Sequence, residues 1–444
     1  MATPVIRKFG GTSVGTAQRM RNVLPIVNTG RRDVVVLSAM SGTTNTLLDI
    51  AAFMRDGANE TARAKINELE ARYRDVVNGL YDSLEGKKRG GEIVRFHFNQ
   101  MCSWTNTMFT PNKEKAIAAQ GELLSTALFH ALLEEHGVNA ALLPALDFMR
   151  IDEHGEPDME HTAALLHAEL KKLPYNALVV TQGFICRNAF GYVDNLKRGG
   201  SDYTATILGA LLCASEVQIW TDIDGMHNND PRFVSPTKPI AELTFDEAAE
   251  LAYFGAKILH PTCVLPAQRS NIPVRLLNTM QPDAVGTVIR QTTSHEGIKA
   301  VASKDGITAI KIKSSRMLLA FGFLRAVFEV FERYKTPIDA ITTSEVAVSL
   351  TVDDATHLKE IVKELQTLGS VEVDRDLAIV CIVGNFGPEK QGYALKIFEA
   401  LKDIPVRMIS YGGSERNVTV VVNAAHKRIA LAALNRHLFF PDTA

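Results

Sequence analysis

The chain has 444 residues, of which 46% are hydrophobic and 22% are charged, and its formal net charge is −2. This composition is that of a folded globular protein, and the length predicts two or three domains. The nearly balanced charge excludes an electrostatic basis for binding nucleic acid or an anionic membrane. We find no targeting signal and no apolar run approaching the ~20 residues that a membrane-spanning helix needs.

The cysteines are scattered along the chain without a C-x-x-C pair, and most lie in apolar stretches: Cys102, Cys186, Cys213, Cys263 and Cys381. Cysteines of this kind are usually small core residues in a reducing compartment. We therefore expect a cytoplasmic protein.

The first part of the chain alternates strands and helices. Continuous apolar runs, typical of strands buried on both faces, occur at residues 33–37, 177–181, 217–221 and 274–277. A helix is expected over residues 201–213 between two of these runs. The alternation predicts an α/β fold with a parallel-rich sheet that is covered by helices on both faces.

Residues 51–138 interrupt this alternation with charged, helix-forming sequence. Apolar residues recur at helical spacing over Glu60–Leu84 and over Glu114–His136. No heptad pattern persists, so a partner-binding coiled coil is disfavoured. We expect a helical lid or a dimer-forming element.

The C-terminal part has a different order of elements. From residue 307 the order is βαββαβ, which predicts a ferredoxin-like motif. A second copy starts at residue 377 and stops one strand short. Residues 298–302 could supply that strand, so the first motif is predicted to be inserted within the second. The predicted domains are residues 1–295, residues 306–375, and residues 297–305 together with 376–444.

A glycine-rich loop follows the first short strand, and residues 7–15 read Arg-Lys-Phe-Gly-Gly-Thr-Ser-Val-Gly. Glycines let backbone N–H groups approach phosphate oxygens, and the helix expected from Thr16 adds partial positive charge at its N-terminus. The lysine precedes the glycines, unlike in the G-x-x-x-x-G-K-[ST] or G-x-G-x-x-G loops. On its own, such a loop is more often a plain turn than a phosphate site.

Three further polar segments lie where strands of the sheet are expected to end. They are residues 38–45, residues 197–204, and residues 221–225 continuing to 229–232. Each has a simpler interpretation, and Ser201-Asp202 alone would be a helix N-cap. Ligands usually bind at the carboxyl ends of the strands in such a sheet. Together the four loops supply the cations, hydroxyls and acids that phosphoryl transfer requires.

These segments resemble the signature motifs of the aspartate kinases. The resemblance rests on Lys8–Val14, on Arg198–Ala205, and on Thr221-Asp222 with Asp230-Pro231-Arg232, and Phe254–Pro261 matches a further motif. The C-terminal motifs resemble the paired ACT domains of that family. The resemblance covers essentially the whole chain and implies an amino-acid kinase-type three-layer α/β sandwich followed by two ferredoxin-like ACT domains. It also implies ATP-dependent phosphorylation of the β-carboxylate of L-aspartate under feedback control, with no C-terminal dehydrogenase.

The resemblance implies a role for each residue that contacts ATP. Lys8 would stabilise the transferred phosphoryl group, while Asp202 would orient Lys8 and help to place Mg²⁺. Gly10 and Gly11 would offer backbone N–H groups to the phosphate. The other residues expected to line the ATP site are Ser38, Thr221, Asp222, His227, Arg232 and Lys257. His227 departs from the tyrosine common in the family at this position.

The resemblance also implies which residues bind aspartate. Arg198 would hold the α-carboxylate, and Glu122 would pair with the α-amino group. Thr44 and Ser201 would hold the β-carboxylate, which accepts the phosphoryl group. No general base is required, because this carboxylate is already ionised at neutral pH. From the sequence pattern alone, Glu122 is a solvated helix residue.

The segment Ile338–Val346 resembles the effector loop of lysine-sensitive aspartate kinases. By that resemblance Asp339, Ser344 and Glu345 face the effector, with Met317 on the opposing segment. Two acids suit a ligand that carries two ammonium groups, so lysine is favoured over threonine. Units of this kind usually pair across a dimer, and we expect at least a homodimer.

Residues 152–161 are rich in acids and histidines, which suggests a metal site. Their spacing, however, follows neither a helical nor a fixed ligand pattern. We therefore expect a charged turn and assign no metal ligands.

Two other functions are weighed against an aspartate kinase. A kinase for another carboxylate, such as glutamate or acetylglutamate, is disfavoured by residues 198–202 and by the paired ACT motifs. A non-catalytic amino-acid sensor is disfavoured because Lys8, Glu122, Arg198 and Asp202 are all present. ATP and Mg²⁺ are the expected cofactors, and neither nucleic acid nor a membrane is expected as a partner.

Overall fold

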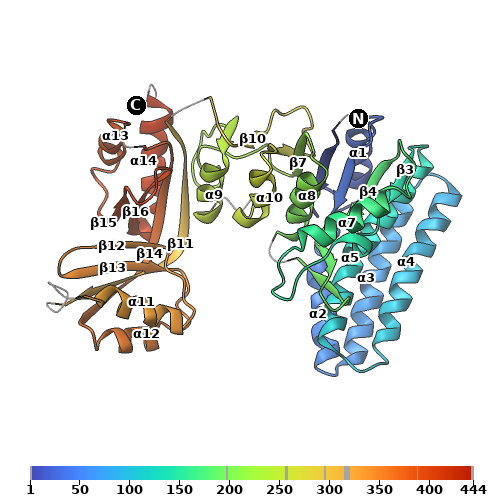
Figure 1. Ribbon diagram of the computed structural model, residues 1–444, viewed down its shortest axis with the longest axis horizontal. Coiled ribbons are helices and arrows are strands. Elements are labelled where there is room, and N and C mark those ends of the chain that lie inside the picture. Colours follow the sequence, from blue (N-terminus) through green and yellow to red (C-terminus); the bar gives the residue numbers. More distant parts are fainter. Residues whose placement is uncertain are drawn as a thin grey trace. The chain divides into compact units, whose positions relative to one another are not determined.

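The computed structural model describes residues 3–196, 199–255, 259–294, 297–314, 321–387 and 389–441 (Figure 1). By their contacts these residues form two compact units. The first comprises the described residues within 1–226 and 259–292, and the second comprises those within 227–258 and 293–444. Residues 227–258 therefore group with the C-terminal part of the chain.

The first unit contains the N-terminal strands and helices. Their bounds are β1 (Val5–Phe9), α1 (Ala17–Val27), β2 (Val34–Leu37), α2 (Thr43–Arg55), α3 (Asn59–Leu80), α4 (Leu84–Trp104), α5 (Pro111–Glu135), β3 (Ala140–Leu142), α6 (Ala145–Phe148), α7 (Met159–Leu170), β4 (Leu178–Gln182), β5 (Ile185–Arg187), β6 (Val193–Asn195), α8 (Gly200–Leu211), β7 (Glu216–Thr221), α10 (Leu265–Arg269), β9 (Val274–Asn278) and β10 (Thr287–Arg290). A short 3₁₀ helix spans Pro261–Val264. β5 and β6 form a separate antiparallel pair.

The main sheet of this unit has the strand order β3-β4-β2-β1-β7-β9-β10. Neighbouring strands are parallel from β3 to β9, and only β10 runs antiparallel to its neighbour β9. β2 reads Val-Val-Val-Leu and is buried along its whole length, as a strand covered on both faces should be. The predicted α/β fold with a parallel-rich sheet is confirmed.

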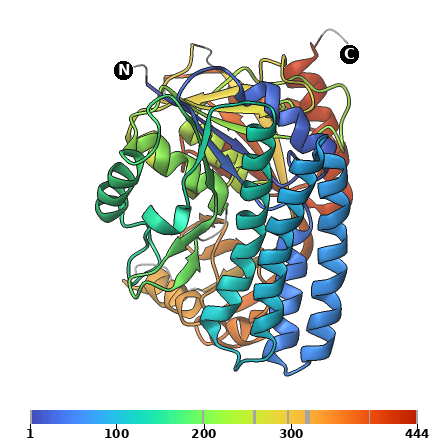
Figure 2. The same cartoon turned by 90° about the vertical axis from the view of Figure 1, so that its right-hand side faces the viewer.

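Helices α2, α3, α4 and α5 lie side by side within the first unit (Figure 2). The helix predicted over residues 60–84 ends at Leu80, because Ser83 caps a new helix by accepting a hydrogen bond from the Gly86 N–H at 2.9 Å. That new helix, α4, is absent from the predicted elements. Three glycines at positions 86, 90 and 91 dilute its helical pattern.

One helix of the described residues, α5, is long and apolar enough to cross a membrane by length and composition. Of its most apolar window, 78% is buried inside the protein. That burial is typical of the core helix of a globular fold. Charged residues interrupt α5, including Lys113, Glu122 and Glu134, so it is not a continuous apolar run.

The second unit contains the remaining elements. Their bounds are β8 (Glu242–Thr244), α9 (Phe245–Tyr253), β11 (Ile298–Lys313), α11 (Phe323–Arg333), β12 (Ala340–Thr343), β13 (Ala347–Val352), α12 (Leu358–Leu365), β14 (Ser370–Gly384), α13 (Tyr393–Ala400), β15 (Val406–Tyr411), β16 (Asn417–Asn423) and α14 (Lys427–Phe439). A short 3₁₀ helix, Ala424–His426, precedes α14. The sheet has the order β12-β13-β11-β14-β16-β15, and its neighbours are antiparallel.

Strands β11 and β14 run through both halves of this sheet. The strands expected separately at 298–302 and 307–312 form one strand, whose register shifts between Lys304 and Ile307. β14 likewise joins two expected strands through Asp376, which has a φ of 56°. The two halves keep separate apolar cores. The predicted limits between the two ACT domains, at residues 305/306 and 375/376, fall inside these two long strands. They remain predictions.

Candidate functional site

The carboxyl ends of β2, β1 and β7 lie at one edge of the sheet, because the three strands are adjacent and parallel. Phe9 pairs with Leu37 on one side and with Trp220 on the other, so the three strands end at the same level. The glycine loop follows β1, and two of the other predicted polar segments follow β2 and β7. The sheet therefore brings three of the four segments together.

Two glycines allow the loop after β1 to pack against the loop after β2. A Cβ at Gly11 would lie 2.9 Å from the carbonyl oxygen of Ala39, and one at Gly15 would lie 2.9 Å from that of Gly11. The Ser41 N–H donates to the Gly11 carbonyl at 3.2 Å. Any side chain at these glycines would separate the two loops.

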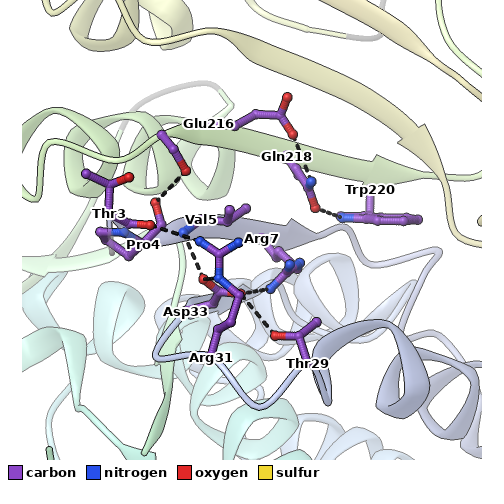
Figure 3. Close-up of polar contacts among 11 residues, drawn as sticks. Thr3, Pro4, Val5, Arg7, Thr29, Arg31, Asp33, Glu216, Gln218 and Trp220 are labelled. Carbon is purple, nitrogen blue, oxygen red and sulfur yellow. Dashed lines mark hydrogen bonds and ion pairs between the residues drawn. The ribbon is translucent and has the colours of Figure 1, made fainter. Parts of the chain in front are cut away.

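Trp220 at the end of β7 holds the glycine loop from the other side. Its carbonyl accepts hydrogen bonds from the Gly10 N–H and the Ser13 hydroxyl, both at 3.2 Å. Its ring stacks on Phe9 with centroids 5.7 Å apart. Its indole N–H donates to the side-chain oxygen of Gln218 at 3.1 Å (Figure 3). The phosphate contact predicted for Gly10 would therefore have to share or replace its bond to the Trp220 carbonyl.

A buried ion pair fixes β1 against the start of β2 (Figure 3). The Arg7 guanidinium pairs with Asp33, which is fully buried. Asp33 also accepts hydrogen bonds from the Val5 N–H at 2.9 Å and from the Thr29 hydroxyl at 3.2 Å. Successive residues of a strand point to opposite faces, so this anchor leaves Lys8 directed to the other face of the sheet.

Lys8 pairs with Asp202, which lies in the first turn of α8. Its Nζ is 2.7 Å from Asp202 Oδ1, and both side chains are largely buried. A carboxylate in the first turn of a helix is stabilised by the partial positive charge there. The pair thus holds a lysine ammonium and a carboxylate next to the glycine loop.

Two glycines fit the start of α8 into this crowded region. The N-cap is Gly199, with a φ of 72°, and a Cβ there would lie 2.4 Å from the Cys263 sulfur. A Cβ at Gly200 would lie 2.4 Å from the Phe184 ring. The simpler interpretation of Asp202 and its neighbour as an N-cap is therefore wrong, because the helix begins before them.

A cavity of about 480 Å³ opens among these loops. Of the predicted site residues, it is lined by Lys8, Gly11, Ser38, Thr44, Glu122, Ser201 and Asp202. The first turns of α2 and α8 both contribute to the lining. The first N–H groups of a helix have no partner within it and carry partial positive charge. The cavity is thus suited to anionic ligands near Lys8.

Glu122 of α5 is an acid buried in the wall of this cavity. It is 3% exposed, and its Oε1 accepts a hydrogen bond from the Ala39 N–H at 3.2 Å. Its Oε2 is buried and has no hydrogen-bond partner among the described residues. Burial raises the pKa of this carboxyl to about 7. The interpretation of Glu122 as a solvated helix residue is wrong.

Small residues bring α5 close enough for this contact. A Cβ at Gly121 would lie 2.7 Å from the Cβ of Ala39. One turn later, the Ser125 hydroxyl donates to the Ser38 carbonyl at 2.8 Å. One feature of the sequence could have indicated that Glu122 is buried: residues 116–121, which precede it, contain no charged residue.

Of the other residues predicted for ATP binding, those that the structure describes do not line this cavity: Gly10, Thr221, Asp222, His227 and Arg232. Thr221 donates through its hydroxyl to Asp222 at 3.1 Å at the end of β7. His227 and Arg232 belong to the second unit, where the Arg232 guanidinium binds Asp230 at 2.6 Å. Three predicted residues lie outside the described part of the chain: Arg198, Lys257 and Met317.

In the second unit, Asp339 lies in a cluster of charged groups. Its side chain is 1% exposed, and its Oδ1 is 2.7 Å from Lys304 Nζ and 2.9 Å from the Tyr253 hydroxyl. Lys304 Nζ also lies 2.7 Å from Asp353. Burial and the nearby Asp339 carboxylate raise the pKa of Tyr253 to about 12, so its hydroxyl stays protonated and donates. Asp339 Oδ2 is buried without a partner in the described chain.

The other predicted effector residues lie apart from this cluster. Ser344 and Glu345 are exposed and follow β12, whereas Asp339 precedes it. The Ser344 N–H donates to the Ala347 carbonyl at 2.8 Å and closes the turn into β13. A strand rises about 3.3 Å per residue, so the length of β12 separates the two groups within one chain.

The charged segment at 152–161 forms turns and a helix start. Asp152 accepts hydrogen bonds from the N–H groups of His154 and Glu156, at 2.8 Å and 2.9 Å. Asp158 caps α7. The predicted charged turn is confirmed. Across the described ranges, we find no group of three or more His, Cys, Asp or Glu that could hold a metal ion.

Comparisons with known proteins extend over both units. Residues 3–278 match the model of the amino acid kinase family, and residues 380–438 match a model of the ACT domain. Lysine-sensitive aspartokinase 3 of Escherichia coli strain K12 is 34% identical, and the alignment covers 99% of this chain and 100% of that relative.

Two solved structures of aspartokinase III from E. coli are also similar. The complex with aspartate and ADP, in the R-state, has a TM-score of 0.78 and 35% identity, covering 98% of this chain and 100% of that one. The complex with lysine and aspartate, in the T-state, has a TM-score of 0.79 and 34% identity, covering 98% and 99%.

Proposed function

The chain belongs to the aspartokinase family, and on this premise we propose that the cavity around Lys8 transfers the γ-phosphoryl group of ATP to the β-carboxylate of L-aspartate. The product would be L-4-aspartyl phosphate. The observation that carries the proposal is that Lys8, Asp202 and Glu122, from three separate elements, line one cavity. Phosphoryl transfer to a carboxylate brings two anions together, so the site needs positive charge and N–H groups and no general base.

Glu122 is proposed to bind the α-ammonium group of aspartate. One of its oxygens is held by the Ala39 N–H, and the other is buried without a partner in the described residues. A buried acceptor without a partner is costly, and an ammonium group would satisfy it. This arrangement favours a free amino acid over an N-acylated one.

The two carboxylates of aspartate are proposed to bind Arg198, Thr44 and Ser201. Arg198 directly precedes Gly199, which lines the cavity, and its guanidinium fork suits the α-carboxylate. Thr44 and Ser201 belong to the first turns of α2 and α8 and would hold the β-carboxylate. That carboxylate would then lie beside Lys8.

Lys8 is proposed to stabilise the phosphoryl group during transfer, and Asp202 to position Lys8. The ion pair between them supports these roles, because it fixes the ammonium group at the cavity. The first N–H groups of α8 and of the glycine loop would add further positive potential. Charge stabilisation of this kind is the main requirement in phosphoryl transfer.

The residues present fit a magnesium ion bound together with ATP. Mg²⁺ in kinases usually takes one or two carboxylates, with phosphate oxygens completing its ligands. Asp202 is the carboxylate proposed here, and the ion would neutralise charge on the phosphates. ATP itself is proposed to contact Gly10, Gly11, Ser38, Thr221 and Asp222 of the first unit. The nucleotide contacts expected for His227, Arg232 and Lys257 stay predictions from the family resemblance.

Regulation by lysine is the proposed role of the second unit. The Asp339 cluster has two carboxylates and one lysine, so one negative charge is in excess, and Asp339 Oδ2 is buried and unpartnered within the described ranges. This suits an ammonium group. Ser344 and Glu345 lie at the other end of β12, so an effector contacting all three residues requires two chains, which supports a homodimer or a higher homo-oligomer. Threonine, with one ammonium group, suits the site less.

The enzyme is proposed to act in the cytoplasm. All five cysteines are free, although Cys186, Cys263 and Cys381 are buried. Such cysteines are typical of a reducing compartment. Fractionation of the source cells with an antibody against the protein tests this placement.

The substrate is tested by measuring ADP release with ATP and Mg²⁺ in the presence of aspartate, glutamate or N-acetylglutamate. We expect turnover with aspartate only. ADP release with glutamate or N-acetylglutamate, and none with aspartate, would assign the site to another acceptor. Lysine and threonine are then added to the active mixture to compare their inhibition.

A further inference from the structure

Ser13 of the glycine loop has no role in the proposed function, although it lies two positions after Gly11. In G-x-x-x-x-G-K-[ST] loops the hydroxyl of the last residue binds Mg²⁺. Residue type alone would give a serine beside these glycines the same role. The structure places its hydroxyl elsewhere, because Ser13 is fully buried and does not line the cavity.

The Ser13 hydroxyl has two partners inside the first unit. It donates to the Trp220 carbonyl at 3.2 Å, since a carbonyl oxygen only accepts. Ser13 Oγ also lies 2.6 Å from Thr279 Oγ1. Because Ser13 has one hydroxyl proton and directs it to Trp220, the Thr279 hydroxyl is the donor of this second bond. Both hydroxyl protons are therefore used within the protein.

Thr279 connects the glycine loop to the end of β7. It directly follows β9, the strand beside β7, and it is 2% exposed. While its hydroxyl binds Ser13, its backbone N–H donates to the Thr221 carbonyl at 2.8 Å. Thr279 therefore holds together two segments of the first unit that are both proposed to contact ATP.

The bonds of Ser13 and Gly10 close the glycine loop into a turn. The Gly10 carbonyl accepts hydrogen bonds from the N–H groups of Ser13 and Val14, at 2.9 Å and 3.2 Å. The Gly10 N–H and the Ser13 hydroxyl both donate to the Trp220 carbonyl at 3.2 Å. Gly11 lies between these two fixed residues and lines the cavity. The position of Gly11 therefore depends on how Ser13 is held.

The bond between Ser13 and Thr279 fastens the loop to the sheet. The two residues are 266 positions apart, and they meet because β1, β7 and β9 are adjacent parallel strands. Both hydroxyls are buried, and a buried polar group that loses its partner is costly. The bond is thus a long-range restraint on a loop whose other side faces the cavity.

We propose that Ser13 and Thr279 are positioning residues for the transferred phosphoryl group. Their hydroxyls hold the glycine loop so that Gly11 is presented to the cavity, and neither hydroxyl binds phosphate or Mg²⁺. The inference rests on the proposed function, since it takes the glycine loop as the phosphate-binding segment. It assigns Ser13 a role different from the one that the P-loop pattern gives to its last residue.

Thr279→Val tests the pair, because valine has the shape of threonine and lacks the hydroxyl. The matched control is Thr181→Val in β4, where a buried threonine hydroxyl has no partner among the described residues. We expect kcat/KM for ATP to fall about fivefold to tenfold in Thr279→Val, as for the loss of one buried hydrogen bond that orients a binding loop. The KM for aspartate should stay within about twofold of wild type.

The control and a conservative variant decide how this result is interpreted. Thr181→Val should match wild type, and Thr279→Ser, which keeps a hydroxyl, should recover most of the kcat/KM for ATP. Unchanged kcat/KM for ATP in Thr279→Val would overturn the proposal. An equal loss in Thr181→Val, or an equal rise of the KM for aspartate, would also overturn it, because the effect would then be a general one on the fold.

A double-mutant cycle with Ser13→Ala separates positioning from ligand binding. If the two hydroxyls act as one unit, the double variant should lose no more than the more affected single variant. The Mg²⁺ concentration for half-maximal activity should be the same in all of them. Fully additive losses would refute the inference, and so would a Ser13→Ala enzyme that needs several times more Mg²⁺, because Ser13 would then act as a ligand.

The wild-type chain separates this inference from the proposed function. If it releases no ADP with aspartate, the proposed function fails, and the Kd of ATP is compared among the variants in place of turnover. The inference then predicts weaker ATP binding in Thr279→Val and wild-type binding in Thr181→Val. Thermal unfolding shows whether each variant folds, and Thr279→Ala replaces Thr279→Val in the same comparisons if the valine variant does not.

Discussion

Lys8 Nζ lies 2.7 Å from Asp202 Oδ1, and this ion pair joins the end of β1 to the first turn of α8. The two residues are far apart in the sequence and come together because β1 lies beside β7, which follows α8. The pair defines where the ammonium group of Lys8 can act. Asp33 forms an ion pair with Arg7 of the same strand, and Trp220 stacks on Phe9 at its end, so the residues on both sides of Lys8 have partners of their own.

Asp202→Asn tests the positioning of Lys8. Removing the charge of a partner residue should lower kcat by roughly 10–100-fold, while the protein remains folded. The KM for aspartate should change much less. Asp246→Asn, on the first turn of α9 in the other unit, is the matched control. An Asp202→Asn enzyme with wild-type kcat would contradict the role of the pair.

The pH dependence of aspartate binding tests Glu122. Burial raises the pKa of this carboxyl to about 7 in the absence of ligand, so it gains a proton as the pH falls through 7. Only the ionised form should bind the α-ammonium group. The KM for aspartate should therefore rise as pH falls below 7, approaching tenfold per pH unit, and stay level above it. In Glu122→Gln the KM should be high and this dependence should vanish.

Two glycine substitutions, Gly121→Ala in α5 and the control Gly91→Ala in α4, test the packing of α5. Alanine at Gly121 would place its Cβ 2.7 Å from the Cβ of Ala39, so the helix must move away from the loop that Glu122 contacts. We expect a loss of roughly 1–3 kcal/mol in the free energy of unfolding and a higher KM for aspartate. Gly91→Ala in α4, where a Cβ meets nothing within 4 Å, should instead stabilise the protein by about 0.5–1 kcal/mol. Denaturant unfolding of both variants measures the difference.

The charged cluster around Asp339 predicts how effector sensitivity is lost. Asp339→Asn removes the carboxylate proposed to bind an ammonium group, so half-inhibition by lysine should need at least about tenfold more lysine, with kcat unchanged. Tyr253→Phe removes the hydroxyl bonded to Asp339 and should have a smaller effect in the same direction. Asp354→Asn, an exposed acid nearby, is the control. Full lysine sensitivity in Asp339→Asn would exclude this residue from the effector site.

Strands and loops could be predicted from the sequence where the residues of that one segment are enough to determine its structure. The valine run of β2 and the glycines after β1 have a single physical explanation each, and both lie where expected. The α/β order of the first unit followed from the same kind of signal. The four polar loops could be assigned to one site only after their sequences were found to resemble the motifs of the aspartate kinases.

Features that depend on tertiary contacts could not be predicted. Glu122 has the pattern of a solvated helix residue, and only the fit of Gly121 against Ala39 buries it. The bond from Gly10 to the Trp220 carbonyl likewise joins two strands that are distant in the chain. β11 was expected as two strands because a local break hides the continuous pairing with β14. In each case the deciding partner lies elsewhere in the sequence.

Trapping of the product with hydroxylamine tests the central claim most directly. The enzyme is incubated with ATP, Mg²⁺, L-aspartate and hydroxylamine, and the hydroxamate is identified by mass spectrometry. We predict the β-hydroxamate of aspartate with the wild-type chain and none with Lys8→Met, while the control Lys172→Met, a surface residue of an exposed ion pair, stays active. Absence of the β-hydroxamate with the wild-type chain, or its formation at the normal rate by Lys8→Met, would contradict the account.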